Sequence, residues 1–186
     1  MADREIDASI LEACRRGDRE AFRALYEVYQ DKVYSICLYF FHGDEAEAAD
    51  VTQEVFLKLF AGIAGFRGDA GFSTWLYRLT QNACLDASRR KAARERLREA
   101  VRADDRTETT SDDVVDPEAV QAALSSLPPQ YRLPILLRYF EDLSYEEMSK
   151  TLNCSMGTVA SRLNRGHKML AGLLAPQRRA GGGRDV

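Results

Sequence analysis

Apolar residues recur every three or four positions along most of the chain, which is the period of an α-helix with one apolar face. From residue 20 this pattern predicts one long helix, or two in succession, with apolar positions at Phe22, Leu25, Tyr26, Tyr29, Val33, Ile36, Cys37 and Phe40. Beyond the turn signal His42-Gly43-Asp44, the pattern resumes at Ala49, Val55, Phe56, Leu59 and Phe60. No alternating strand pattern stands out, so an all-α fold is expected.

Four glycines between residues 62 and 71 interrupt the helical pattern and predict a loop. Either Ser73 or Thr74 is expected to cap a third helix that begins near Trp75. The inward face of this helix is predicted to hold Leu76, Leu79, Ala83 and Ala87. Its polar stripe is predicted to hold Arg78, Asn82, Asp86 and Arg89.

Residues 103–116 contain six acidic side chains among fourteen residues and show no apolar periodicity. Such a segment buries too little apolar surface to offset its ordering entropy, so a flexible acidic linker is expected. The predicted organisation is two small helical domains, residues 1–92 and 117–174, joined by a linker over residues 93–116. The Gly-rich residues 175–186 are expected to form a disordered tail.

The second domain carries the signals of two short helices separated by a sharp turn. Ser144 and Glu147 fit a capping box at the start of the first helix. Asn153 tolerates the left-handed backbone of a sharp turn, and Ser155 is expected to cap the second helix. The predicted inward stripe of the second helix is Val159, Leu163, Gly166 and Leu170. The predicted outward stripe is Thr158, Ser161, Arg162, Arg165 and Lys168.

Short polar side chains interleaved with arginine on this outward stripe favour a helix-turn-helix whose second helix enters the major groove of DNA. The alternative is a helical hairpin whose outer face is simply solvated. Charge is also unevenly distributed, because residues 75–98 hold seven basic and two acidic side chains in a chain of net charge −3. Residues 1–60, by contrast, hold seven basic and thirteen acidic ones. The segment 75–98 is therefore a candidate nucleic-acid surface.

Motifs of enzymes and metal sites are missing from the sequence, which has no GxSxG, P-loop, Rossmann glycine pattern or HExxH. The four cysteines lie far apart, at residues 14, 37, 84 and 154, and only two histidines accompany them. Isolated thiols packed as small apolar side chains are favoured over a zinc site. We therefore expect no catalytic residue, no metal and no cofactor. A signal peptide and an apolar run of about 20 residues are both missing, so a cytoplasmic protein is expected.

Three blocks of the sequence, in this order, resemble the extracytoplasmic-function class of bacterial sigma factors, the small two-domain promoter-recognition subunits of RNA polymerase. The core-binding region two of that class is similar to AFRALYEVYQDKVYSICLYFFHGDEAEAADVTQEVFLKLF, and its promoter-melting segment is similar to FRGDAGFSTWLYRLTQNACLD. Its region four is similar to SSLPPQYRLPILLRYFEDLSYEEMSKTLNCSMGTVASRLNRGHKML. The resemblance covers about residues 20–172 and implies a factor that binds core polymerase and directs promoter-specific initiation.

For the first domain, the resemblance implies a surface on the second predicted helix that docks on the coiled coil of the polymerase clamp. Its residues are Asp50, Gln53, Glu54 and Phe56. A solvated acidic face is the alternative. The resemblance also implies a site that captures unstacked bases of the −10 element, where each unstacked step costs a few kcal/mol. Its residues are Phe66, Phe72, Trp75, Arg78, Asn82, Arg89 and Arg90. Trp75 is alternatively an ordinary core residue, and the two last arginines would neutralise phosphates.

For the second domain, the resemblance implies that the outward stripe of the second helix reads the −35 element. The DNA-binding residues would be Thr158, Ser161, Arg162, Arg165 and Lys168. Two positions depart from the usual pattern. Ala160 occupies a position where relatives commonly carry lysine or arginine. Pro134 lies inside an expected helix, which should kink there or begin one turn later because proline removes a backbone hydrogen bond.

The implied partners are core RNA polymerase, through its clamp coiled coil and its flap, and promoter DNA. An anti-sigma protein is a candidate third partner, and no direct membrane insertion is expected. Within the cytoplasm the protein would associate with the nucleoid as part of the holoenzyme. A stand-alone helix-turn-helix regulator is a competing hypothesis, which would use only residues 117–172. Residues 20–91 discriminate between the two, because a simple regulator would not need them.

Overall fold

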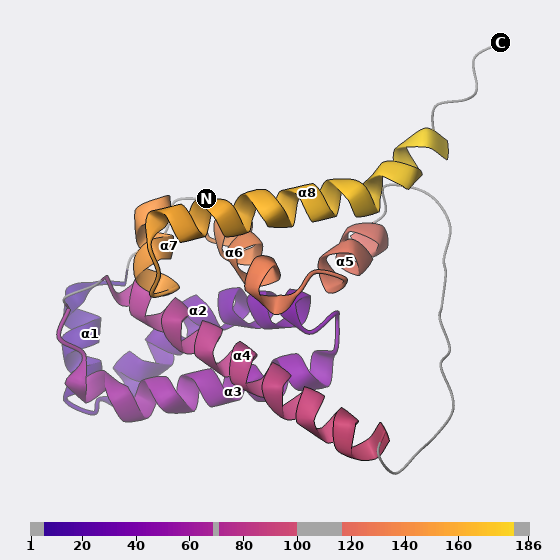
Figure 1. Cartoon of the computed structure of the whole chain (residues 1–186). Coiled ribbons are helices and arrows are strands. Elements are labelled where there is room, and N and C mark those ends of the chain that lie inside the picture. Colours follow the sequence, from indigo (N-terminus) through magenta and orange to yellow (C-terminus); the bar gives the residue numbers. More distant parts are fainter. Residues whose placement is uncertain (1–5, 69–70, 100–116, 181–186) are drawn as a thin grey trace.

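A computed structural model describes residues 6–68, 71–99 and 117–180 of the chain. Two groups of helices make up these residues (Figure 1). The first group contains α1 (Ala8–Arg15), α2 (Arg19–Phe40), α3 (Glu45–Gly62), a short 3₁₀ turn η1 (Ile63–Gly65) and α4 (Phe72–Glu99). The second contains α5 (Pro117–Ser125), α6 (Pro129–Phe140), α7 (Tyr145–Thr151) and α8 (Met156–Ala180). The expected all-α fold with two helical units is confirmed.

An aspartate begins each of the first three helices. The carboxylate of Asp7 accepts a hydrogen bond from the N–H of Ser9 in α1, and that of Asp44 accepts one from the N–H of Glu47 in α3. Asp18 does the same for two N–H groups at the start of α2. A side-chain oxygen at this position satisfies amides that have no partner inside the helix. The long apolar stripe after residue 20 accordingly forms one helix, α2, rather than two.

Three boundaries differ from the sequence prediction. The helix expected near Trp75 begins at Phe72, where the N–H of Trp75 donates to the carbonyl oxygen of Gly71, so Ser73 and Thr74 lie inside the helix and do not cap it. The same helix continues to Glu99, seven residues into the expected linker, because residues 93–99 are mostly strong helix formers. Likewise α8 continues to Ala180, inside the expected tail, and ends just before three consecutive glycines. The remaining residues of the expected linker and tail lie outside the described ranges.

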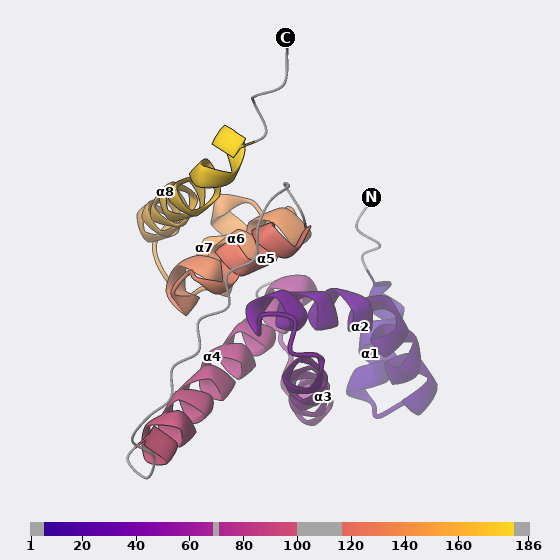
Figure 2. The same cartoon turned by 90° about the vertical axis from the view of Figure 1, so that its right-hand side faces the viewer.

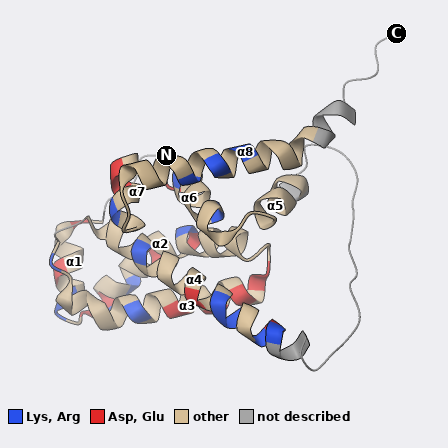
Figure 3. Ribbon diagram, in the orientation of Figure 1, with Lys and Arg blue, Asp and Glu red and all other residues tan. Residues whose placement is uncertain are grey.

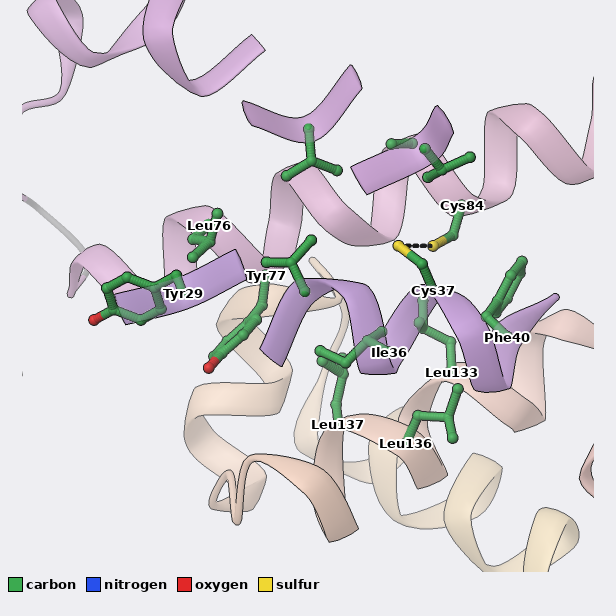
Figure 4. Packing of buried hydrophobic residues seen from close by; sticks show 14 of the residues in the cluster. Tyr29, Ile36, Cys37, Phe40, Leu76, Tyr77, Cys84, Leu133, Leu136 and Leu137 are labelled. Carbon is green, nitrogen blue, oxygen red and sulfur yellow. Dashed lines mark hydrogen bonds between the residues drawn. The ribbon is translucent and has the colours of Figure 1, made fainter. Parts of the chain in front are cut away.

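Helix α2 lies at the centre of the molecule, with α3 and α4 on one side and the second helical unit on the other (Figure 2). Its predicted apolar face is largely buried, at Leu25, Tyr29, Val33, Ile36, Cys37 and Phe40. The sulfur atoms of Cys37 and Cys84 approach to 3.8 Å where α2 meets α4 (Figure 4). The hydrogen bond with Cys37, followed by burial, raises the pKa of the Cys84 thiol well above its ordinary value.

On α3 the apolar pattern was wrong at two positions. Ala48 is buried and Ala49 is exposed, and Phe60 is 53% exposed although its ring packs edge-on against Phe22. A second apolar residue of α3, Leu57, is 63% exposed. Helix α3 therefore has two apolar faces, one in the core and one toward solvent.

The helix-turn-helix of the second unit forms as predicted. Both hydrogen bonds of the capping box join Ser144 and Glu147, and Asn153 takes a left-handed φ of 47° in the turn. The hydroxyl of Ser155 accepts the N–H of Thr158 at 3.2 Å, which caps α8. Helix α6 begins at Pro129 and runs through the buried Pro134, so the alternative of a start one turn after Pro134 is wrong.

The inner face of α8 packs closely on α6. Val159 and Leu163 are buried as predicted. Gly166 lies where a methyl group would come within 2.6 Å of the Cδ1 atom of Ile135 and 3.4 Å of the carbonyl oxygen of Tyr131. A larger residue at this position would therefore require the end of the Ile135 side chain to move.

The two units share one apolar core. Figure 4 shows Leu133, Leu136 and Leu137 of α6 against the side of α2 that carries Ile36 and Phe40. In the part of the chain that the structure describes, no helix is both long and apolar enough to cross a membrane.

Candidate functional site

A groove of about 560 Å³ runs between α2 and α3. Aromatic rings form much of its wall, with Tyr26 and Phe56 in edge contact at 4.7 Å between ring centroids. Asp50 and Gln53 line the groove and are exposed, whereas Phe56 is only 5% exposed and forms its floor. Three of the four predicted polymerase-binding residues therefore meet at one surface.

The fourth, Glu54, lies outside this groove. Its carboxylate is 2.6 Å from the Nζ of Lys58 on the same helix and 2.8 Å from the guanidinium of Arg90 on α4. The hydrogen bond from Lys58, followed by the one from Arg90, lowers the pKa of Glu54. Glu54 thus connects α3 to α4.

Sequence reasoning missed the apolar rim of the groove. Leu57 and Phe60 belong to it together with Tyr26, and all three are substantially exposed. The sequence did contain a signal, because Leu57 and Phe60 are apolar residues three positions apart on a helix whose inward face is already formed by other apolar residues. Exposed apolar residues gathered at a groove are typical of a protein-binding surface.

The aromatic residues of the predicted −10 site form one cluster at the start of α4. The ring centroid of Phe66 lies 5.1 Å from that of Trp75 and 5.9 Å from that of Phe72. Phe72 is 8% exposed and also contacts Tyr29, so it supports the cluster from the core. Phe66 and Trp75 are half-buried.

A cavity of about 230 Å³ opens beside this cluster. It is lined by Gly65, Phe66, Arg67, Gly68, Thr74, Trp75 and Arg78. Trp75 packs against the core and also lines this cavity. Asn82 is exposed one turn beyond Arg78 and does not line the cavity.

Four cations of α4 have partners within the protein. The guanidinium of Arg78 donates a hydrogen bond to the carbonyl oxygen of Lys150 in α7. Arg89 pairs with Asp86 at 3.1 Å and Arg90 pairs with Glu54 at 2.8 Å. The next residue, Lys91, pairs with Asp44 at 3.2 Å.

The outward face of α8 is different. Ser161, Arg165 and Lys168 are exposed, and within the described ranges neither of these two cations is paired with an acid. Thr158 is half-buried and its Oγ1 lies 2.9 Å from the Oγ of Ser155. Arg162 is also half-buried, with a long contact of 3.9 Å from its guanidinium to the Cys154 sulfur.

A second cleft, of about 570 Å³, lies between the two units. Gln81, Leu85 and Arg89 of α4 line one side of it. Pro134 of α6 and Arg162 of α8 line the other. A predicted −10 residue and a predicted −35 residue therefore share one cleft.

Taken together, the fold and these surfaces define a helix-turn-helix protein that carries an additional helical unit with an apolar-rimmed groove. Comparison with known families matches residues 25–95 to Sigma-70 region 2 and residues 118–170 to Sigma-70 region 4. The chain belongs to the extracytoplasmic-function group of RNA polymerase sigma factors.

Similar proteins span nearly the whole chain. The RNA polymerase sigma-H factor of Pseudomonas aeruginosa is 35% identical, over 95% of this chain and 97% of that protein. The ECF RNA polymerase sigma factor SigW of Bacillus subtilis is 33% identical, over 84% and 90%.

Two solved structures have the same fold. The sigma factor RpoE of Bartonella quintana, in complex with the anti-sigma factor NepR, gives a TM-score of 0.67 at 21% identity and covers 83% of this chain and 96% of that one. CnrH in complex with the cytosolic domain of CnrY gives 0.68 at 23% identity, over 90% and 96%.

Proposed function

We propose how this sigma factor divides the work of promoter-specific initiation among the surfaces described above. The observation that carries the proposal is that region 2 and region 4 both match, with a separate candidate surface for each task. A stand-alone helix-turn-helix regulator would not need the groove of α2 and α3 or the aromatic cluster of α4. The alternative hypothesis is therefore not favoured.

The groove between α2 and α3 is assigned to core polymerase. Its apolar rim, which includes Leu57, offers an area to bury against a helix of the polymerase clamp. Asp50 and Gln53 would supply polar contacts at the same surface. Glu54 acts indirectly in this assignment, by holding Arg90 of α4 against α3.

The cavity beside Phe66 and Trp75 is assigned to an unstacked base of the −10 element. A sigma factor opens DNA without a covalent step, so it must stabilise bases that have left the duplex stack. Half-buried aromatic rings provide faces on which a base can stack, at about 1–3 kcal/mol per base. Asn82, exposed farther along α4, is suited to contact the strand next to the captured base.

The outward face of α8 is assigned to the −35 element. Thr158 and Ser161 are short enough to let the helix approach the base edges, and Arg165 can reach a guanine or a phosphate. Lys168 lies one turn farther along and is suited to a phosphate contact. The predicted phosphate contact at Ala160 would be missing, since this exposed position has no charge.

We place the activity in the cytoplasm, where the polymerase transcribes the chromosomal DNA. There the factor would be bound to the nucleoid as part of the holoenzyme. An anti-sigma partner stays a prediction for this chain. No catalytic role is assigned to any residue, because promoter opening as described requires binding only.

Reconstituted transcription tests the proposal. The protein is added to core polymerase that lacks any sigma factor, and run-off products are mapped on genomic DNA from the source organism. Specific transcripts should start at promoters that share −10 and −35 elements. If core polymerase with this protein starts nowhere that core polymerase alone does not, the proposed function is wrong.

A further inference from the structure

Two of the four cysteines meet in the core, although 47 positions separate them in the sequence. Cys37 of α2 and Cys84 of α4 are both 0% exposed, and their sulfur atoms lie 3.8 Å apart (Figure 4). Both are free thiols. A disulfide bond is about 2.05 Å long, so the two sulfur atoms need to approach by roughly 1.8 Å to form one. A small movement of the side chains or of the two helices is therefore enough to join them.

A buried hydroxyl accompanies this pair. Thr52 of α3 is 7% exposed, and its Oγ1 atom has no ordinary hydrogen-bond partner in the described part of the chain. A buried polar atom without a partner is uncommon in proteins and calls for an explanation. The hydroxyl lies close enough to Cys37 to lower the pKa of its thiol. Thr52 is therefore a donor available to a thiolate on Cys37.

The two thiols have different roles. The hydrogen bond from Cys84, and to a smaller extent the one from Thr52, lower the pKa of Cys37, although burial opposes the shift. The same contact raises the pKa of Cys84, and burial and the negative charges of Cys37 and Glu54 act in the same direction. The first proton lost by the pair therefore leaves a thiolate on Cys37 and a thiol on Cys84. A thiolate is the reactive form of cysteine toward oxidants.

Thr52 also connects the pair to the surface, because it lines the groove between α2 and α3. Cys37 lies beside Thr52 and behind the wall of this groove. The sulfur atoms are closed to solvent, so a small oxidant reaches them only when α3 moves locally away from α2. The reaction is therefore expected to be slower than that of an exposed thiol.

We propose that Cys37 and Cys84 are a redox-active dithiol, which a peroxide converts to a disulfide that joins α2 to α4. The Cys37 thiolate attacks one oxygen of hydrogen peroxide and becomes a sulfenic acid, and the hydroxide that leaves takes up the proton lost by Cys37. The Cys84 sulfur then attacks the sulfenic sulfur and displaces a second hydroxide, which leaves as water with the Cys84 proton. Two thiols lose two electrons and two protons, and the peroxide becomes two molecules of water.

Mass spectrometry of the full chain detects the product. Folded protein is treated with hydrogen peroxide, remaining thiols are alkylated, and the protein is digested with trypsin. Peptide 33–58, which contains Cys37, should be joined to peptide 79–89, which contains Cys84. Dithiothreitol should separate the two peptides. The double variant Cys14→Ala/Cys154→Ala retains only the proposed pair and should lose two hydrogen atoms and take up no alkyl group.

The controls separate this bond from other oxidation. Cys37→Ala and Cys84→Ala should each abolish the joined peptides, and circular dichroism shows whether their helices are retained. The natural protein gives the same joined peptides, so the test does not depend on the folding of any variant. The proposal is overturned if the folded natural protein keeps Cys37 and Cys84 as free thiols at a peroxide concentration that oxidises them in urea. Joined peptides that contain only Cys14 or Cys154 overturn it as well.

Thr52→Val tests the donor, because valine has a similar shape and no hydroxyl. The oxidation rate near neutral pH should fall about threefold or more, and the rise of the rate with pH should move to higher pH, because the Cys37 thiolate loses a hydrogen bond. Thr80→Val is the matched control, since the hydroxyl of the buried Thr80 donates to the carbonyl oxygen of Leu76 at 3.0 Å. Its pH profile should match that of the natural protein. An unchanged profile for Thr52→Val would overturn the role of Thr52.

One consequence rests on the function proposed above, because the groove lined by Thr52 is assigned to core polymerase. Bound polymerase would cover the groove and hold α3 against α2, so it should slow the appearance of the joined peptides by at least about fivefold. Joined peptides that form equally fast with and without core polymerase would overturn the placement of polymerase on this groove and leave the dithiol supported. Free thiols in the folded protein without polymerase would overturn the dithiol even if transcription succeeds.

Discussion

Among the described residues, the C-terminal half of α4 and the outward face of α8 are both basic, and the cations assigned to DNA on each differ in what they already contact (Figure 3). On α4, Arg89 and Arg90 are paired with Asp86 and Glu54. On α8, Arg165 and Lys168 are exposed and unpaired within the described part of the chain.

The difference matters for how each surface meets DNA. A cation on α8 can approach a phosphate without giving up an earlier partner. Arg90 must exchange a carboxylate for a phosphate, and that carboxylate belongs to the helix that carries the polymerase groove. Exposed ion pairs contribute only about 0–1 kcal/mol, so this exchange costs little free energy. It does connect DNA binding at the −10 surface to α3.

Arg132 is a buried structural arginine that belongs to neither basic surface. Its replacement should have the largest effect on stability. Arg132→Leu leaves the carbonyl oxygens of Leu124, Leu127 and Phe40 buried without a donor, so the free energy of unfolding should fall by about 3–5 kcal/mol. Urea denaturation measures it. Arg138→Leu, on the same helix but partly exposed, is the control and should cost about 1 kcal/mol or less. Equal losses would contradict this account of Arg132.

Leu57 tests whether the polymerase groove acts separately from the α4 surface next to it. Leu57→Asp places a charge on the apolar rim, so the affinity for core polymerase should fall at least tenfold, or about 1.4 kcal/mol. The fold should be unaffected because the side chain is 63% exposed. Lys58→Ala, the next residue on α3 but outside the groove, should bind nearly normally in the same titration.

The salt dependence of promoter binding compares the two basic surfaces directly. Arg165→Ala should cost about 1–3 kcal/mol and reduce the slope of log affinity against log salt by about 1. Arg90→Ala should reduce the slope by less, because Glu54 takes up a cation from solution when Arg90 moves to a phosphate. Equal slope changes, measured with the reconstituted holoenzyme, would show that the ion pairs of α4 do not matter for DNA binding.

Acidification should lower the stability of the protein where the two units meet. This is the smallest of the expected effects. The ring of His42 is partly buried beside Arg132. This burial and the charges of Arg132 and Lys91 lower the pKa of His42 to about 4, although the charge of Asp44 opposes the shift. The unfolded chain takes up a proton near pH 6.5 and the folded chain only near 4, so stability falls between these values.

Because His42 as a whole residue is exposed, the loss by pH 5 should be about 1 kcal/mol or less. His42→Asn keeps a residue that tolerates the positive φ of 65° but does not titrate. Urea denaturation at pH 7 and pH 5 should therefore show a smaller drop for the variant than for the natural protein. An identical drop would mean that His42 does not contribute.

Local signals in the sequence predicted the helices and the helix-turn-helix well. The apolar period of α2, the capping box at Ser144 and the turn residue Asn153 are each determined by near neighbours in the chain, so they could be read without a structure. Helix α1 was missed, although Asp7 is a typical cap, because the helix is short and little of it is buried. The ends of α4 and α8 were wrong because the charge of the predicted linker and the glycines of the predicted tail were given more weight than helix propensity.

The candidate sites were predicted less completely, because they depend on which helices meet. Glu54 precedes its partner Arg90 by 36 residues, and nothing near Glu54 in the sequence indicates that it faces Arg90 and not the groove. The same holds for Arg132, whose contact with the carbonyl of Phe40 joins residues 92 positions apart. Local periodicity places a residue on a face, but it does not say what packs there.

Gly166 has a consequence for how new promoter preferences can arise. Of the residues assigned to DNA on α8, Ser161, Arg165 and Lys168 are exposed, so substitutions among these three should cost little stability and can change the sequence that is read. The position behind them is constrained, because a side chain at Gly166 would require the tip of the Ile135 side chain to move. Substitutions at the exposed positions can therefore change the sequence that is read one residue at a time, whereas a substitution at Gly166 also requires Ile135 of α6 to repack.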